Sequence, residues 1–213
     1  MTAAPPVLRL RRIDLGLADV DPGTRAALRA MTHRGAVPDQ AVRAAARTIL
    51  DAVRADPDAA VRQANANHGG GLADGRLVLD RDELLRARDA LEPPVRTALD
   101  QAIANVRRFA ETQRPQTTTT RIADGIEIER RWLPLARVGC YVPGGTAPYP
   151  SSLVMTVVPA QVARVGAIIV ASPASGLGVV DPVLLGVAGL LDVDAFVVAG
   201  GAQAIGALAF GLP

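Results

Sequence analysis

The sequence predicts an α/β protein, in which an N-terminal helical region is followed by an incomplete Rossmann-like parallel sheet built in the order βαβαβα. Two observations predict it. Over residues 1–113 the apolar residues recur mainly at helical spacing. After residue 137, short apolar runs alternate with helix-like segments, which is typical of parallel strands joined by right-handed crossovers. We therefore expect a mostly helical domain over residues 1–132, ending in a short strand or hairpin, and an incomplete Rossmann-like domain over residues 133–213.

Several helices are expected in the first region. The apolar residues of the first lie on one helical face, and a second helix near 58–67 ends at three consecutive glycines, which suit a C-terminal stop. Asp80 with Glu83 resembles a capping box for a helix to about Ala90. Pro93 and Pro94 suit the first turn of a helix to about Gln113. The apolar face of the first of these helices consists of Val42, Ala46, Ile49, Leu50 and Val53.

Two strand-like segments interrupt the helical pattern. The first, 77–79, is short and apolar. In the second, Ile126, Ile128, Arg130 and Trp132 occupy alternate positions, as side chains on one face of a strand do. This segment follows a turn at Asp124–Gly125, so we expect a β-hairpin before the second domain. The run 117–120 of four threonines is expected to form an edge strand or a loop.

The third region supplies three strands and three helices. The strands are expected at 138–142, 167–171 and 194–198, of which the second is apolar throughout, as in a strand buried on both faces. The helices are expected from a Ser151 or Ser152 cap to about Arg164, then over 182–191 and 202–210.

The composition excludes several classes of protein. All 23 basic residues are arginine, they are interspersed with acidic residues, and the net charge is only +2, so a nucleic-acid-binding surface is not expected. Apolar runs such as 167–171 are far shorter than the roughly 20 residues of a membrane span, and no signal-peptide pattern is present. The sequence predicts a cytoplasmic protein that does not bind membranes.

Metal and nucleophile candidates are few. Cys140 is the single cysteine and lies in a strand, so a buried, unreactive thiol is expected. His33 and His68 are too far apart in the sequence to form a ligand pair, and both are expected near helix ends.

Three loops are expected at the carboxyl ends of the parallel strands, where such sheets bind ligands: 143–150, 172–181 and 200–203. In the first, Gly144 and Gly145 allow a phosphate to approach the backbone closely.

Two of these loops carry a family resemblance. The segment Tyr141-Val-Pro-Gly-Gly-Thr-Ala-Pro-Tyr-Pro-Ser151 resembles the signature of histidinol dehydrogenase, and Val198-Ala-Gly-Gly-Ala-Gln-Ala-Ile-Gly-Ala-Leu-Ala-Phe-Gly211 resembles a second block of that family. The resemblance covers 138–213 well. Before residue 130 it is limited to helical character and to the opening Leu8-Arg-Leu-Arg-Arg-Ile-Asp14.

The resemblance implies an NAD-dependent, zinc-requiring, four-electron oxidation of L-histidinol to L-histidine in a homodimer. It places Tyr141 and Gln203 at the positions that contact NAD. From the residues alone, Tyr141 also fits a partly buried strand tyrosine and Gln203 a helix-capping glutamine. The family is about twice as long as this chain, and its catalytic Glu-His pair and zinc ligands are expected beyond Pro213. No catalytic residue and no metal ligand is therefore assigned here.

Three functional hypotheses stay open at this point. The chain is part of an active enzyme, or a truncated nucleotide-binding or oligomer-interaction module without catalysis, or a functionless remnant. An open reading frame downstream of Pro213 that encodes the Glu-His pair would favour the first.

Overall fold

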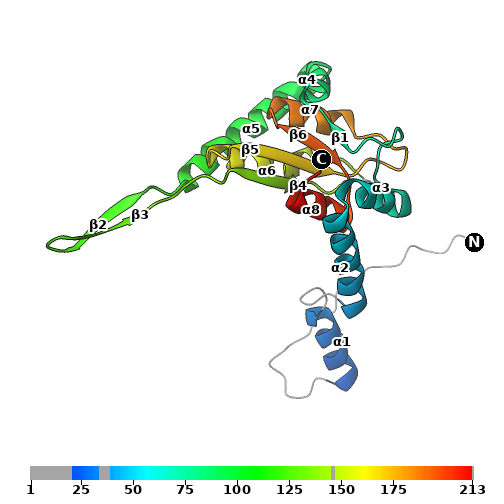
Figure 1. Cartoon of the computed structure of the whole chain (residues 1–213), viewed down its shortest axis with the longest axis horizontal. Coiled ribbons are helices and arrows are strands. Elements are labelled where there is room, and N and C mark those ends of the chain that lie inside the picture. Colours follow the sequence, from blue (N-terminus) through cyan, green and yellow to red (C-terminus); the bar gives the residue numbers. More distant parts are fainter. Residues whose placement is uncertain (1–20, 34–38, 145–146, 213) are drawn as a thin grey trace, which may run out of the picture. The chain divides into compact units, whose positions relative to one another are not determined.

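Figure 1 shows the computed structural model of the chain, which describes residues 21–33, 39–144 and 147–212. Contacts divide the chain into two compact units, Met1–Ala44 and Ala45–Pro213. The domain boundary predicted after residue 132 stays a prediction. The opening segment 8–14 and Gly145 lie outside the described residues, as does the side chain of His33 at the end of α1 (Pro22–His33).

The predicted helices are present. α2 (Gln40–Ala55) begins in the first unit and ends in the second. In the part of the chain that the structure describes, no helix is long and apolar enough to cross a membrane. The remaining helices are α3 (Pro57–His68), α4 (Arg81–Asp89), α5 (Pro93–Gln113), α6 (Pro150–Val162), α7 (Pro182–Leu190) and α8 (Gly201–Phe210).

The main sheet contains the three predicted parallel strands and one further strand. β4 (Arg137–Tyr141), β5 (Ala167–Ser172) and β6 (Ala195–Val198) are parallel neighbours in chain order, as the βαβαβα pattern predicts. β1 (Val78–Leu79) pairs antiparallel with β6, giving the order β1-β6-β5-β4. The sheet is therefore mixed and not purely parallel, because the short apolar segment at 77–79 covers the outer edge of β6.

Helices cover both faces of this sheet (Figure 1). α6 and α7 pack on one face, where Phe196 is fully buried, and α8 packs on the other with α3 and the end of α2. α4 and α5 lie outside α7 and α6 and complete a further layer. Each fully buried large apolar side chain contributes about 1.5–3 kcal/mol to folding. The alternation of strand side chains assigns Cys140, Ile168, Val170, Phe196 and Val198 to the first face, and Ile169, Ala171 and Val197 to the second.

Most of the predicted helix ends are confirmed, and one is wrong. α3 ends at Gly69, and Asp80 with Glu83 forms the predicted capping box of α4. α6, however, has Tyr149 at its N-cap and no side-chain cap. The predicted serine cap fails because Pro150, whose missing N–H costs nothing at the first helical position, starts the helix two residues before the Ser152 start that a Ser151 cap implies.

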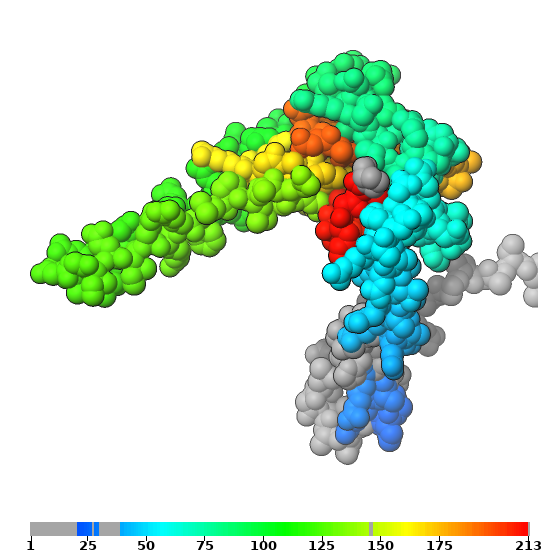
Figure 2. Space-filling model, viewed as in Figure 1, coloured from blue at the N-terminus to red at the C-terminus, as the bar shows by residue number. Residues whose placement is uncertain are grey.

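The predicted hairpin is formed by β2 (Thr118–Ala123) and β3 (Ile126–Arg130), with Gly125 at a φ of +78° in the turn. β3 ends before Trp132, the last residue of the predicted alternation. Every residue of both strands is exposed, and the ribbon extends away from the main sheet (Figures 1 and 2).

Helices α4 and α7 approach each other closely at a glycine. A Cβ atom placed on Gly189 would lie 2.1 Å from the carbonyl oxygen of Leu84, which is far shorter than the contacts that Cβ atoms make with non-bonded atoms in proteins. The absence of a side chain at this position is therefore what allows the two helices to touch.

We expect Gly189→Ala to lower the free energy of unfolding by at least about 1–3 kcal/mol, because the methyl group must push α4 away from α7. This loss exceeds the roughly 1 kcal/mol that alanine gains over glycine in a helix. Denaturant unfolding measures the change. Gly176→Ala is the matched control, since no atom lies within 4 Å of a Cβ added there. Equal stability of the two variants would contradict this packing argument.

Cys140 is the buried thiol that its strand position predicts. It lies in β4 among the apolar residues of the first face, and burial raises the pKa of its thiol, against a smaller opposing contribution from the Thr156 hydroxyl. Little thiolate is therefore present near neutral pH, and thiolate is the nucleophilic form.

The folded chain should react with a thiol reagent at pH 8 at least about tenfold more slowly than the urea-unfolded chain, because burial both shields the sulfur and disfavours thiolate. Spectrophotometric titration with an aromatic disulfide measures both rates. Equal rates would show that the thiol is accessible in the folded protein.

Candidate functional site

The candidate site lies at the carboxyl edge of the parallel strands. Tyr141, the last residue of β4, pairs with Ala171, and Ser172, the last residue of β5, pairs with Val198 of β6. The chain segments that follow the three strands therefore leave the sheet beside one another, as the strand order predicts.

Pro173, immediately after β5, is the common contact of the surrounding loops. A Cβ atom on Gly70, Gly144 or Gly200 would lie 2.9, 3.3 or 3.0 Å from an atom of the Pro173 side chain. The backbone of Gly70 also accepts a hydrogen bond of 2.8 Å from the N–H of Ala174. Three glycines from separate segments thus pack directly against one proline.

A cavity of about 540 Å³ opens at this edge. It is lined by both predicted residues, Tyr141 and Gln203, which lie 62 positions apart in the sequence (203 − 141). The helical region contributes residues that sequence reasoning did not assign to the site, among them His68 at the end of α3. The other lining residues are Ile49, Gly69, Gly70, Gly144, Pro173, Ala174, Gly176, Gly200, Gly201 and Ala202.

Tyr141 links β4 to the start of α8. Its hydroxyl accepts a long hydrogen bond of 3.4 Å from the backbone N–H of Gly201. The N-cap residue of α8 is Gly200, which has no side chain, so the first turn of this helix has no side-chain cap. The N-terminus of α8, where free N–H groups and the helix dipole favour electronegative groups, therefore opens on the cavity.

Gln203 is almost fully buried and is connected to α3. Its Nε2 lies 3.5 Å from Oδ1 of Asn65, and Nδ2 of Asn65 donates a hydrogen bond of 3.0 Å to the carbonyl of Val198. No local pattern points to Asn65, because it is a helix residue separated from Gln203 by 138 positions. The glutamine is thus a buried residue of the cavity wall, and not a cap of α8.

Ser172 lies behind the glycine loop that follows β4. Its side chain is fully buried, and among the described residues its Oγ has no hydrogen-bond partner. A Cβ on Gly144 would lie 3.0 Å from this oxygen. Any side chain at position 144 would therefore press on the serine.

His68 occupies the predicted position at the C-terminal end of α3, where it is exposed and lines the cavity. No group of three or more His, Cys, Asp or Glu side chains that could hold a metal ion occurs within residues 21–33, 39–144 and 147–212.

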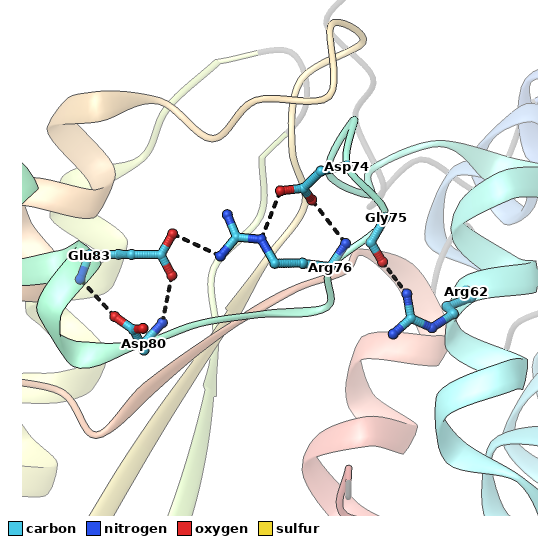
Figure 3. A network of polar contacts seen from close by, with 6 residues as sticks. All are labelled: Arg62, Asp74, Gly75, Arg76, Asp80 and Glu83. Carbon is cyan, nitrogen blue, oxygen red and sulfur yellow. Dashed lines mark hydrogen bonds and ion pairs between the residues drawn. The ribbon is translucent and has the colours of Figure 1, made fainter.

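A second cavity of about 480 Å³ lies between α3 and the segment 175–178, and two arginines line it. Arg62 forms an ion pair with Asp58 and donates to a backbone carbonyl. Arg76 forms ion pairs with Asp74 and Glu83. Each guanidinium thus has an acidic partner, and the two arginines anchor the loop before β1 to α3 and α4. Figure 3 shows the network of Arg62, Asp74, Gly75, Arg76, Asp80 and Glu83.

Comparison with known proteins gives a consistent result. A family model described as "Histidinol dehydrogenase" matches residues 32–213. The chain is 43% identical over 205 residues to histidinol dehydrogenase of Nocardia farcinica, covering 94% of this chain and 46% of that protein. For the Leifsonia xyli protein of the same name, identity is 46% over 201 residues, with 93% and 45% covered.

The fold agrees with a solved structure. The crystal structure of histidinol dehydrogenase from Elizabethkingia anophelis superimposes with a TM-score of 0.75 at 24% identity, covering 87% of this chain and 43% of that chain. This chain therefore spans somewhat less than half the length of the relatives it matches. From the family match and the curated relatives, the chain belongs to the histidinol dehydrogenase family.

Proposed function

We infer that this chain provides the NAD-binding part of a cytoplasmic histidinol dehydrogenase, which oxidises L-histidinol to L-histidine in histidine biosynthesis. One observation carries the inference. The two residues that the family resemblance assigns to NAD, Tyr141 and Gln203, line the same cavity at the carboxyl edge of the parallel sheet. Dinucleotides bind at this edge of doubly wound sheets.

The residues of the cavity suit a dinucleotide. The Tyr141 ring offers an apolar surface, the Gln203 amide offers a hydrogen bond, and the first turn of α8 offers backbone N–H groups without a side-chain cap. A bound NAD would supply the hydride acceptor that oxidation of the substrate carbon requires. The residues named here would bind and orient the dinucleotide, and none of them is assigned a proton transfer.

Zinc does not fit the described residues, because they contain no cluster of three or more potential ligands. The matched motifs also do not include the Glu-His pair expected to act as the base. We therefore assign no metal and no catalytic residue to these 213 residues, and we expect them to form no NADH from histidinol.

A role in self-association is supported by the hairpin. Strand pairing of Thr120 with Ile128 and of Ala123 with Ile126 puts the isoleucines on one face, while Arg121 and Glu127 lie on the other. Ile126 and Ile128 are 54% and 57% exposed. An isolated two-stranded ribbon is marginally stable, and apolar surface of this kind commonly contacts a partner. We therefore propose that this face contributes to a homodimer.

NAD should bind weakly, with a dissociation constant on the order of millimolar. A dinucleotide usually contacts both halves of a doubly wound sheet, and the three parallel strands of this chain make up one half. Tyr141→Ala and Gln203→Ala should each weaken binding severalfold. Amide chemical shifts during an NAD titration measure this, and the shifted residues should surround the cavity. Gln101→Ala, on α5 and outside the cavity lining, is the control. Tight binding unaffected by both site variants would place the dinucleotide elsewhere.

The hairpin proposal predicts that Ile128→Glu weakens self-association by about tenfold or more, because a carboxylate would lose its hydration in the interface. Light scattering over a wide concentration range measures the effect. Glu127→Gln alters charge on the opposite face and should leave association unchanged. A protein that is monomeric before any substitution would contradict the proposal.

A further inference from the structure

Asn65 connects three elements beneath the candidate site. It projects from α3, it is 8% exposed, and its amide meets the end of β6 on one side and Gln203 of α8 on the other. A buried amide that uses both its donor and its acceptor in this way has a single favourable orientation.

The orientation of the Asn65 amide is fixed by the main chain. The carbonyl of Val198 can only accept a hydrogen bond, so the nitrogen of Asn65 must face it, at the 3.0 Å observed. The oxygen Oδ1 of Asn65 is then directed toward Gln203.

The orientation of the Gln203 amide follows from that of Asn65. With Oδ1 of Asn65 facing it, Gln203 presents its nitrogen, at 3.5 Å. The reverse orientation would place two carbonyl oxygens against each other in a buried environment, where their repulsion is poorly screened. Although the hydrogen bond is long, the alternative is therefore clearly worse.

The remaining oxygen of Gln203 faces the other way. Its Oε1 lies 2.9 Å from the position of a Cβ on Gly201, at the N-terminal turn of α8 that lines the cavity. None of the described residues donates a hydrogen bond to this oxygen. Asn65 thus turns one amide N–H of Gln203 toward α3 and leaves the Gln203 oxygen as an acceptor at the start of α8.

We propose that Asn65 is a positioning residue that makes Gln203 present its carbonyl oxygen to a hydroxyl or amide N–H donor of the dinucleotide, such as a ribose hydroxyl. A phosphate carries only acceptor oxygens at neutral pH, so this carbonyl disfavours it. The pyrophosphate must then lie away from Gln203, at backbone N–H groups. The inference rests on the proposed NAD site and specifies the chemistry of one contact within it.

The test uses the 213-residue chain and four probes. They are NAD, the phosphate-free nucleosides adenosine and nicotinamide riboside, and inorganic pyrophosphate. Asn65→Ala and Gln203→Ala should each weaken the binding of NAD and of one nucleoside by about two- to tenfold, as expected for one lost hydrogen bond. The double variant should be no weaker than Gln203→Ala, because Asn65 acts through Gln203. Pyrophosphate binding should not change in any variant.

Asn67→Ala is the matched control. Asn67 lies on the same helix and also accepts a hydrogen bond from a glutamine amide, that of Gln63, but it is exposed and away from the cavity. This variant should bind NAD as the unmodified chain does.

A second measurement does not depend on the variants folding. In the unmodified chain, the side-chain NH₂ protons of Gln203 should show nuclear Overhauser contacts to Asn65, and should keep them when NAD is added. Loss of the contacts to Asn65 when NAD is added would mean that the amide turns over on binding, and would overturn the inference.

The possible failures are distinguishable. If the unmodified chain binds no NAD, the proposed function fails and the inference fails with it. If Gln203→Ala weakens NAD binding while Asn65→Ala does not, only the inference fails. The same holds if the variants weaken pyrophosphate binding as strongly as nucleoside binding.

Discussion

The close packing of three glycines against Pro173 is the constraint on which the candidate site depends. Gly70, Gly144 and Gly200 belong to segments that are distant in the sequence, and each leaves room for the proline ring only because it has no side chain. The ring therefore holds the end of α3 and the loops after β4 and β6 within one small volume. Gly70, Gly144, Gly200 and Pro173 all line the cavity between the strand ends and α3.

The same arrangement explains why residues of the helical region belong to the site. α3 packs beside α8 on the second face of the sheet, and its final turn reaches the carboxyl edge at Gly69 and Gly70. A helix that stabilises the sheet by burying Val61 thus also carries Asn65 to the polar cluster and His68 to the cavity. Stability and binding are consequently coupled through one helix, and a change in its packing would affect both.

Local signals in the sequence predicted most of the fold. The βαβαβα order, the hairpin and the capping box of Asp80 with Glu83 each follow from patterns within a few residues, and the structure confirms them. The serine cap of α6 was wrong because two local signals competed and Pro150 started the helix. The pairing of β1 with β6 could not be predicted, since two residues carry too little pattern to specify a partner more than 100 positions away.

The candidate site was predicted only in part, for a related reason. Tyr141 and Gln203 were found through motifs that follow strands, and general rules for parallel sheets place such motifs at one edge. Asn65 and His68 lie on a helix that follows another helix, and they match no motif, so only the three-dimensional packing of α3 brings them to the cavity.

The buried hydroxyl of Ser172 has a consequence for how this fold could be engineered. Among the described residues this hydroxyl has no partner, and a buried hydroxyl in that state costs about 1–3 kcal/mol. The serine occupies a position on β5 whose same-face neighbours, Ile168 and Val170, are apolar. Alanine would fill nearly the same volume without that cost, so this is a position where a thermostable variant is readily obtained. Because Ser172 also lies 3.0 Å from the place of a Cβ on Gly144, this gain in stability would be made directly behind the glycine loop of the candidate site.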